Sequence, residues 1–354
     1  MSYNLTLEQE ELLNDSFWLA YILKLINKVD NLWVKSYISN FMLFFSSIYT
    51  NELIVANFGN ISPSISMTRK ELKEIRMNNI KLLPMENTEN IKSKMNDMGV
   101  DFDHYVFDMT IICDSELELF DTNFRMWEYQ VKNQEQFENL NAIVNTPLTW
   151  SKRFLGEYYE KIFELLDELS DKYLEKIKKC NLESHSYPSC KLFNNKLSID
   201  EKIYIMQRYG LIKSMIWFEN IFKEKMKLEI GDLKFDFERF FFKIKAIVIE
   251  IIGNDRKNCN YEIIKQLLIT NDKTIDSKFF KINRKMRDNI HYSKINQLNN
   301  EEIEILKKYQ DIYLKNMISI FDSNISVKFN LGYKLALRLA KLEYWSRDGK
   351  NRKI

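Results

Sequence analysis

The stretch FFKINRKMRDNIHYSKI, residues 279–295, carries the pattern that indicates the fold class. At about 100° per residue, the angular step of an α-helix, its large apolar side chains gather within one arc of about 80°. These residues are Phe279, Ile282, Met286 and Ile290. The core of a helical bundle requires such a stripe, so we expect a helix over 276–294 whose apolar face is buried.

The same helix carries a polar face about 130° away from the apolar one. Arg284, Arg287 and His291 gather on this face, and His291 is the last of only three histidines in the chain. Arg284 is spaced to pair with Asp288 one turn further on. Because the polar face points away from the core, it meets either solvent or a partner. An ordinary solvated helix face is the simplest interpretation, and a site for chemistry is the alternative.

The composition of the whole chain agrees with long helices. Among 354 residues there are only 8 Gly and 4 Pro, whereas all-β folds use these residues in their many turns. Hydrophobic residues make up 45% and charged residues 29%, which is typical of a globular chain with a large core. We therefore predict an all-α protein. The formal net charge of +2 argues against a protein that coats nucleic acid, but it leaves a local site open.

The best domain boundary lies at Asn-Thr-Pro, residues 145–147, because this pattern is typical of a helix start. The predicted parts are an N-terminal helical domain (1–145), a helical bundle (146–325) and a basic C-terminal helical tail (326–354). Ser198 and Glu201 form a capping-box pattern for a further helix, which follows an expected loop at 181–198. Helices are expected within 5–50 (two), over 106–131, from about 150 to 180, and over 199–229, 231–254, 276–294 and 300–322.

No segment of this sequence predicts secretion or membrane insertion. Glu8, Glu10 and Glu11 precede the first apolar stretch, where a secretory signal would need a basic start. The most apolar run there, FWLAYILKLI, is broken by Lys24 and is too short to cross a bilayer. The four cysteines are widely spread, so reduced thiols are expected. These features predict a cytoplasmic protein with no membrane contact.

The residue types on the polar face suit the cleavage of RNA. The ribose 2′-OH is a built-in nucleophile, so the reaction needs no metal and no cofactor. The imidazole of His291 can move protons near neutral pH, and the guanidinium groups of Arg284 and Arg287 can hold a charged phosphate. Cleavage needs both a base and an acid, whereas this segment has one histidine. Two protomers placed face to face would bring a second histidine.

The stretch resembles the catalytic motif of the HEPN superfamily, which contains helical-bundle ribonucleases of toxin–antitoxin and antiviral systems. In that motif an Arg, usually followed by a polar residue, is separated from a His by four to six intervening residues. The six residues between Arg284 and His291 match the spacing, whereas Arg287 followed by Asp288 matches the polar neighbour. Either Arg284 or Arg287 could therefore correspond to the Arg of the family motif. The resemblance covers about residues 150–323, and mainly 276–322.

The resemblance implies a homodimeric, metal-independent endoribonuclease that acts as a toxin or antiviral effector, with RNA and a possible antitoxin or regulatory protein as partners. It assigns catalysis to Arg284, Arg287, Asp288 and His291. We expect the neighbouring Asn289 and Tyr292 to contact RNA. Some members of the superfamily have lost catalysis and only bind RNA or partners. A non-catalytic helical scaffold is therefore the alternative function.

Two oppositely charged segments suggest a further contact. Residues 101–124 hold seven acidic residues and no Lys or Arg, and residues 331–354 hold seven Lys/Arg and two acidic residues. Lys334, Arg338 and Lys341 share one face of the expected tail helix and are candidates for RNA phosphate contacts. An anionic membrane or simple packing are the alternatives for this tail. An acidic helix face could compete with RNA for it, through Asp114, Glu118 and Asp121.

A zinc site is the remaining candidate. Cys180, His185 and Cys190 are separated by four residues each, and Cys259 could be a fourth ligand. Zinc sites usually use closer cysteine pairs. A loop that contains a histidine by chance is the simpler interpretation, so no metal is predicted.

Overall fold

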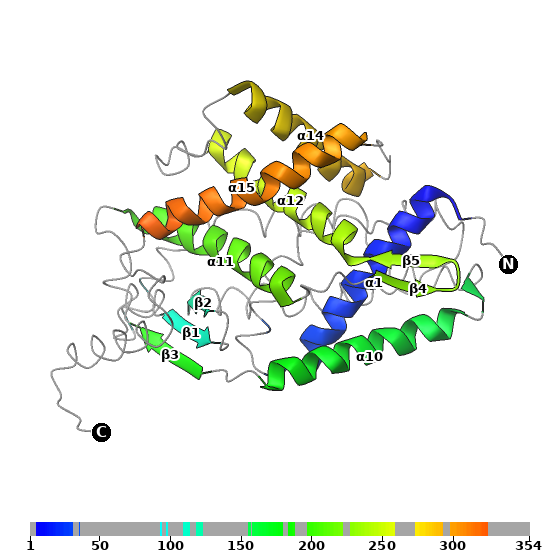
Figure 1. Ribbon diagram of the computed structural model, residues 1–354. Helices are drawn as coiled ribbons and strands as arrows, with labels where there is room; N and C mark the ends of the chain where they lie inside the picture. Colours follow the sequence, from blue (N-terminus) through cyan, green and yellow to red (C-terminus); the bar gives the residue numbers. More distant parts are fainter. Residues whose placement is uncertain are drawn as a thin grey trace, which may run out of the picture.

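The computed structural model describes mainly the helical part of the chain, and this part is predominantly α-helical, as predicted (Figure 1). The described residues are 5–30, 109–113, 118–122, 155–156, 158–179, 183–187, 197–221, 227–258, 273–292 and 298–324, with the single positions 35, 93 and 97.

Helix α1, Leu7–Lys28, is buried along most of its length. It begins with a capping box, in which Thr6 and Gln9 each bind the backbone N–H of the other. The run FWLAYIL in its middle is buried on every side, which explains why no single apolar stripe marks this helix. α1 packs against α10, Tyr158–Lys179, and confirms the first of the two helices expected within residues 5–50.

Helix α12, Phe237–Asn258, occupies the centre of the bundle. It contacts α1, α11, α14 and α15, and Figure 1 shows these helices on different sides of it. Aromatic rings fill the space near its start, where Phe237 and Phe241 stack at 5.4 Å between ring centroids. Each fully buried ring of this kind contributes about 1.5–3 kcal/mol to folding. The core of the described residues therefore lies around α12.

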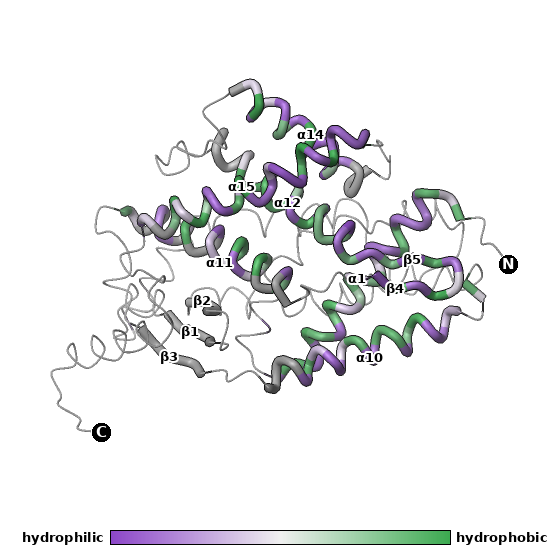
Figure 2. The backbone as a smooth tube through the Cα atoms, in the orientation of Figure 1, coloured by the Kyte–Doolittle hydropathy of each residue, from purple (hydrophilic) through white to green (hydrophobic). Residues whose placement is uncertain are grey.

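The remaining helices of the bundle agree closely with the sequence predictions. They are α11, Ile199–Ile221; α14, Lys273–Tyr292; and α15, Asn300–Asn324. The expected capping box of Ser198 and Glu201 starts α11. A second reciprocal cap, between Asn299 and Glu302, starts α15. Figure 2 shows hydrophilic and hydrophobic residues alternating along α10 and α14, as expected for helices with one buried face.

A β-hairpin replaces the adjoining ends of two predicted helices. Strand β4, Lys227–Ile230, pairs antiparallel with β5, Leu233–Asp236. The helix predicted over 199–229 therefore ends too late, and the helix predicted over 231–254 begins too early. Gly231 turns the chain with a φ of 60°, and a Cβ there would lie 2.7 Å from the Tyr158 ring. The hairpin thus depends on glycine for both conformation and space.

A second sheet contradicts the helix predicted over 106–131. Strand β1, Met109–Cys113, lies between β2, Glu118–Thr122, and β3, Glu183–Tyr187, and both pairings are antiparallel. β3 falls in the expected loop. The segment MTIIC is rich in β-branched residues, which favour strands. Its apolar residues are consecutive, so they do not follow the spacing of three or four that marks one face of a helix. Positions 118 and 121 lie on opposite faces of a strand, so the predicted acidic helix face is not formed.

The N-terminal helix shares its core with the C-terminal bundle. α1 contacts α10, α12 and β5, although it belongs to the predicted domain 1–145. The boundary at 145–147 lies outside the described residues, as does the tail 326–354, so the division into domains stays a prediction. None of the helices in the described part is long and apolar enough to cross a membrane.

Candidate functional site

Helix α12 carries charged side chains in a setting that is otherwise apolar. Lys243, Lys245 and Glu250 are all buried in this helix, within the run FFFKIKAIVIEII. A buried charge is costly unless an opposite charge or hydrogen bonds compensate for it. Each of these three residues has such a partner on another helix. Lys245 pairs with Glu219 of α11 and Asp311 of α15, and the partners of Lys243 and Glu250 define two further charge clusters with different exposure.

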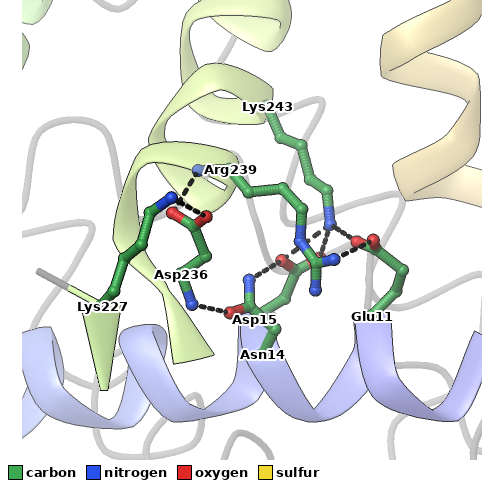
Figure 3. Close-up of polar contacts among 7 residues, drawn as sticks. All are labelled: Glu11, Asn14, Asp15, Lys227, Asp236, Arg239 and Lys243. Carbon is green, nitrogen blue, oxygen red and sulfur yellow. Dashed lines mark hydrogen bonds and ion pairs between the residues drawn. The ribbon is translucent and has the colours of Figure 1, made fainter. Parts of the chain in front are cut away.

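The first group, which we call the buried cluster, consists of Glu11 and Asp15 of α1 with Arg239 and Lys243 of α12 (Figure 3). The Lys243 ammonium donates to both Asp15 carboxylate oxygens at 2.8 Å and also to Glu11. Arg239 pairs with Glu11 at 2.9 Å. The side chains of Lys243 and Asp15 are only 8% and 7% exposed, so this pair is removed from solvent.

Burial and charge act in opposite directions on this pair. Burial raises the pKa of the Asp15 carboxyl above its ordinary value, and the attraction of Lys243 offsets part of that rise. Burial alone would lower the pKa of Lys243, but the attraction of Asp15 and Glu11 is larger in sum and raises it. Lys243 therefore stays protonated across the neutral range and ties α12 to α1.

The hairpin is connected to the same cluster. The backbone N–H of Asp236 donates to the Asn14 side chain at 2.7 Å, and Asn14 donates to Asp15 (Figure 3). The Asp236 carboxylate accepts from the Arg239 backbone N–H at 3.2 Å, so it caps α12 where β5 ends. Lys227 of β4 lies 3.6 Å from the same carboxylate. The buried cluster therefore fixes where the strand becomes a helix.

Amide side chains join α14 and α15 to the middle of α12. Asn283 is fully buried and donates to the Ala246 carbonyl at 2.9 Å. Gln310 reaches both the Asn283 oxygen and the Phe242 carbonyl at 3.4 Å. These contacts fix the rotation of α14 about its axis, and its arginines therefore face away from the core.

The second group, the arginine cluster, consists of Glu250 of α12 with Arg284, Arg287 and Asp288 of α14. Arg284 donates from Nε to Glu250 at 3.2 Å, and its side chain is 48% exposed, whereas that of Glu250 is 8% exposed. Arg287 lies 2.8 Å from its neighbour Asp288. The ion pair predicted between Arg284 and Asp288 is wrong. Arg284 pairs with Glu250 instead, and Asp288 pairs with Arg287.

Hydrogen-bonding capacity is left over in the arginine cluster. The buried Nε of Arg287 has no hydrogen-bond partner, and the buried Asp288 oxygen lacks a well-aligned donor despite its proximity to Arg287. Within the described part of the chain, the two Nη atoms of Arg284 form no hydrogen bond or ion pair. The buried cluster shares one of these features, since Arg239 Nε is also unpartnered. Both clusters therefore contain a partly exposed guanidinium, since the side chain of Arg239 is 38% exposed and that of Arg284 is 48% exposed. They differ at the end of the guanidinium, because Arg239 pairs with Glu11 through an Nη atom, whereas Arg284 uses only Nε among the described residues.

The backbone of α14 places His291 beside the two arginines. The helix continues to Tyr292, so His291 lies one turn beyond Arg287 and within about 20° of the direction of Arg284. The backbones of Asn289 and Tyr292 belong to the same last turns. The side chains of Asn289, His291 and Tyr292 lie outside the described residues, as do Lys334, Arg338 and Lys341.

Of the four candidate zinc ligands, one lies within the described residues. His185 belongs to β3, opposite Ile111 of β1, and the three cysteines considered with it lie outside the described part of the chain. In the ranges that the structure describes, no group of three or more His, Cys, Asp or Glu side chains is arranged to hold a metal ion.

Comparisons of the sequence and the structure with known proteins gave no match. No family model matches the chain, and neither the curated proteins nor the solved structures contain a significant match. Function must therefore be argued from the two charge clusters themselves.

The sequence patterns located α14 and its polar face but missed the partners that α12 provides. Glu250 lies 34 residues before Arg284, and Asp15 lies 228 residues before Lys243. One local signal was present, because three charged residues interrupt the apolar run of α12 and each had to find a partner if that run was buried. The identity of the partners requires the fold.

Proposed function

We propose that this protein is a metal-independent endoribonuclease of HEPN type, in which Arg284, Arg287 and His291 act on RNA. One observation carries the proposal. α14 is a continuous helix to Tyr292, with its apolar face in the core, so the two arginines and the histidine position share its outer face. Arg284 is half exposed there, with free donors on its Nη atoms.

The proposed chemistry uses the 2′-OH of the RNA as nucleophile. A base removes the 2′-OH proton, the oxygen attacks the neighbouring phosphorus, and the bond from phosphorus to the 5′ oxygen breaks. An acid protonates the leaving 5′ oxygen, and a 2′,3′-cyclic phosphate remains. His291 serves as a proton-transfer group, because imidazole titrates near neutral pH. Arg284 and Arg287 stabilise the additional negative charge on the phosphate in the transition state.

A symmetric homodimer supplies the second proton-transfer group. One imidazole cannot be base and acid in the same step, and a twofold axis next to α14 would bring the partner's outer face opposite its own copy. In this arrangement each cleft holds two histidines and two pairs of arginines. Asn289 and Tyr292 would contact the RNA next to the cleaved bond.

The decisive experiment compares wild-type protein with His291→Ala on a labelled single-stranded RNA in the presence of EDTA. The wild type is expected to cleave and His291→Ala to be inactive, with unchanged helical circular dichroism. Lys278→Ala is the matched control, because Lys278 is exposed on the same helix and pairs with Glu301 at the surface. Cleavage by His291→Ala at the wild-type rate would refute the assignment.

Dimer formation has a separate test. His291→Ala protein is mixed with the Arg284→Ala, Arg287→Ala protein, and the subunits are allowed to exchange. If both histidines and both arginine pairs are required in one cleft, the mixed dimers stay inactive. A protein that cleaves RNA while sedimenting as a monomer at micromolar concentration contradicts the dimeric site.

The biological setting is part of the proposal. The protein would act in the cytoplasm as a toxin or antiviral effector, restrained by an antitoxin or another regulatory protein. Lys334, Arg338 and Lys341 of the basic tail would hold RNA phosphates. Deleting residues 331–354 is then expected to weaken RNA binding and to flatten its dependence on salt, because fewer counterions are released.

A non-catalytic helical scaffold is the second candidate, and one observation favours it. Both arginines already have a carboxylate partner in the chain, Glu250 for Arg284 and Asp288 for Arg287. Such pairs also occur in proteins without any activity. Binding of RNA without cleavage by the wild type would select this candidate.

A further inference from the structure

Glu250 is a buried carboxylate in the most apolar part of α12. The residues on both sides of it, Ile249 and Ile251, are buried, and Glu250 itself is 6% exposed. Its hydrogen bond within the described residues comes from Arg284 Nε at 3.2 Å. A buried carboxylate with one such contact is a poor source of stability, since an apolar side chain of similar volume is often neutral or stabilising there. The placement of Glu250 therefore calls for another explanation.

The contact with Glu250 uses one particular edge of the guanidinium. Arginine can present the pair Nε and Nη on its side, or the two Nη atoms at its end, to an oxyanion. Glu250 accepts from Nε, which leaves the end of the guanidinium without a partner among the described residues. Arg284 is 48% exposed, so this end is accessible to a ligand. A planar fork held at its base is suited to bidentate binding of a phosphate.

The neighbouring contacts hold this arrangement in place. Asn283, the residue before Arg284, is anchored to the Ala246 carbonyl one turn before Glu250 on α12. The anchor fixes the position of the α14 backbone relative to α12, and Glu250 then fixes the direction of the Arg284 side chain. An exposed arginine would otherwise sample many rotamers, and ordering it during binding has an entropic cost.

We propose that Glu250 is a positioning residue, which holds Arg284 through Nε so that its two Nη atoms are preorganised for an RNA phosphate. This proposal rests on the proposed ribonuclease function for the identity of the ligand. Glu250 does not touch the RNA in it, and its negative charge is directed to the far side of the guanidinium. Substituting Glu250 is therefore expected to reduce activity only through its effect on the position of Arg284.

The test is a double-mutant cycle between Glu250→Gln and Arg284→Ala. Cleavage is measured as kcat and KM, and binding is measured with a 2′-O-methyl RNA oligonucleotide that cannot be cleaved. Glu250→Gln is expected to lower kcat about 10-fold to 100-fold, the usual range for a misdirected catalytic group. In the Arg284→Ala background the same change is expected to have no further effect.

Two further variants separate positioning from structure. Glu250→Leu is expected to unfold at the same denaturant concentration as the wild type or higher, while it loses as much activity as Glu250→Gln. Glu219→Gln is the matched control, because Glu219 of α11 also pairs with a buried α12 residue, Lys245. This control is expected to keep full activity. Loss of activity in proportion to loss of stability in both carboxylate variants would overturn the proposal.

The outcomes distinguish this inference from the proposed function. If the wild type binds the oligonucleotide without cleaving RNA, the ribonuclease proposal fails, and the same cycle on binding still tests Glu250. Non-additive losses of affinity would then support positioning. Additive losses of affinity or activity, or a Glu250→Gln protein equal to the wild type in both, would overturn it.

Discussion

The buried cluster and the arginine cluster lie on the same helix and contain the same kinds of residue, yet their environments differ. Each combines two carboxylates with two basic side chains and links α12 to one other helix. Lys243 and Asp15 are almost completely removed from solvent, whereas Arg284 is half exposed. In the buried cluster the ammonium is satisfied by two carboxylates. In the arginine cluster the guanidinium end is free. The first cluster holds α12 against α1, and a ligand for the second is our proposal.

The largest expected effect is on stability and concerns Lys243. Lys243→Ala removes the closest counter-charge of Asp15 in the core, whereas Glu11 keeps Arg239, and breaking a buried ion pair in this way costs about 3–5 kcal/mol. The free energy of unfolding from urea titration measures the loss. Lys234→Ala is the control, since the Lys234 side chain is exposed on the outer face of the hairpin, and it is expected to change stability by less than about 0.5 kcal/mol. Equal stability of the two variants would remove the distinction between the clusters.

The second expected effect is a difference in coupling. A double-mutant cycle between Asp15→Asn and Lys243→Met is expected to give a coupling of about 1–3 kcal/mol in unfolding free energy. The corresponding cycle between Glu250→Gln and Arg284→Ala is expected to give less than about 1 kcal/mol, because solvent screens the half-exposed guanidinium. A larger coupling in the second cycle would show that the arginine cluster is structural in the same sense as the buried one.

A third effect appears in the pH dependence and has opposite signs for two carboxylates. The pKa of Asp15 is raised above its ordinary value of 3.8, so its contribution to stability is fully present below that value and is lost as the pH rises through the raised pKa. The pKa of Glu302, which pairs with Lys285 of α14, is lowered below its ordinary value of 4.5. Its contribution is present above 4.5 and is lost as the pH falls through the lowered pKa.

The measurement for this third effect is the difference in unfolding free energy between wild type and variant across the acid range. For Asp15→Asn, the advantage of the wild type is expected to shrink as the pH rises from about 4. For Glu302→Gln, it is expected to grow as the pH rises towards 4.5 and to stay constant above that value. Slopes of the same sign would contradict the assigned environments of the two groups.

The smallest expected effect concerns Lys281, which is exposed one turn before Arg284 on α14. If Arg284 binds an RNA phosphate as proposed, a lysine one turn away on the same helix is in a position to bind a neighbouring phosphate. Lys281→Gln is expected to weaken binding of the 2′-O-methyl RNA a few-fold and to reduce the salt slope by about one unit. Lys278→Gln, whose lysine pairs with Glu301, serves as the control. An unchanged salt slope for Lys281→Gln would limit the ligand site to the arginines.

Helices whose limits carry local chemical signals were predictable from the sequence. The cap of Ser198 and Glu201 and the stripe from Phe279 to Met286 depend only on residues three or four positions apart, and both are present in the structure. The hairpin was missed although Gly231 and Asp232 are a common turn pair, because apolar residues on both sides of the turn also suit a helical phase. The strand Met109–Cys113 was missed because a short apolar run does not distinguish a helix from a strand.

The candidate site was predictable only in part, for the same reason. Arg284 and Arg287 were located by their helix face, but the pairing of Arg284 with Asp288 was wrong, since the choice of partner depends on α12. Glu250 could not be identified as the partner of Arg284, because it lies 34 residues earlier in the sequence and no local pattern relates it to α14. Asp15 looked like one of several acidic residues near a helix start, and only packing against α12 shows that its carboxylate is buried.

The tie between α1 and α12 also has a consequence during synthesis on the ribosome. Asp15 and Lys243 are 228 residues apart, which corresponds to roughly 10–50 s of translation at about 5–20 residues per second. The run FWLAYIL of α1 leaves the exit tunnel well before α12 is made, and α10, the other helix that packs against α1, is also made much later than α1. The nascent chain must keep one of its most apolar helices from aggregating until α10 and then α12 arrive. Binding of this segment by a chaperone would meet that need.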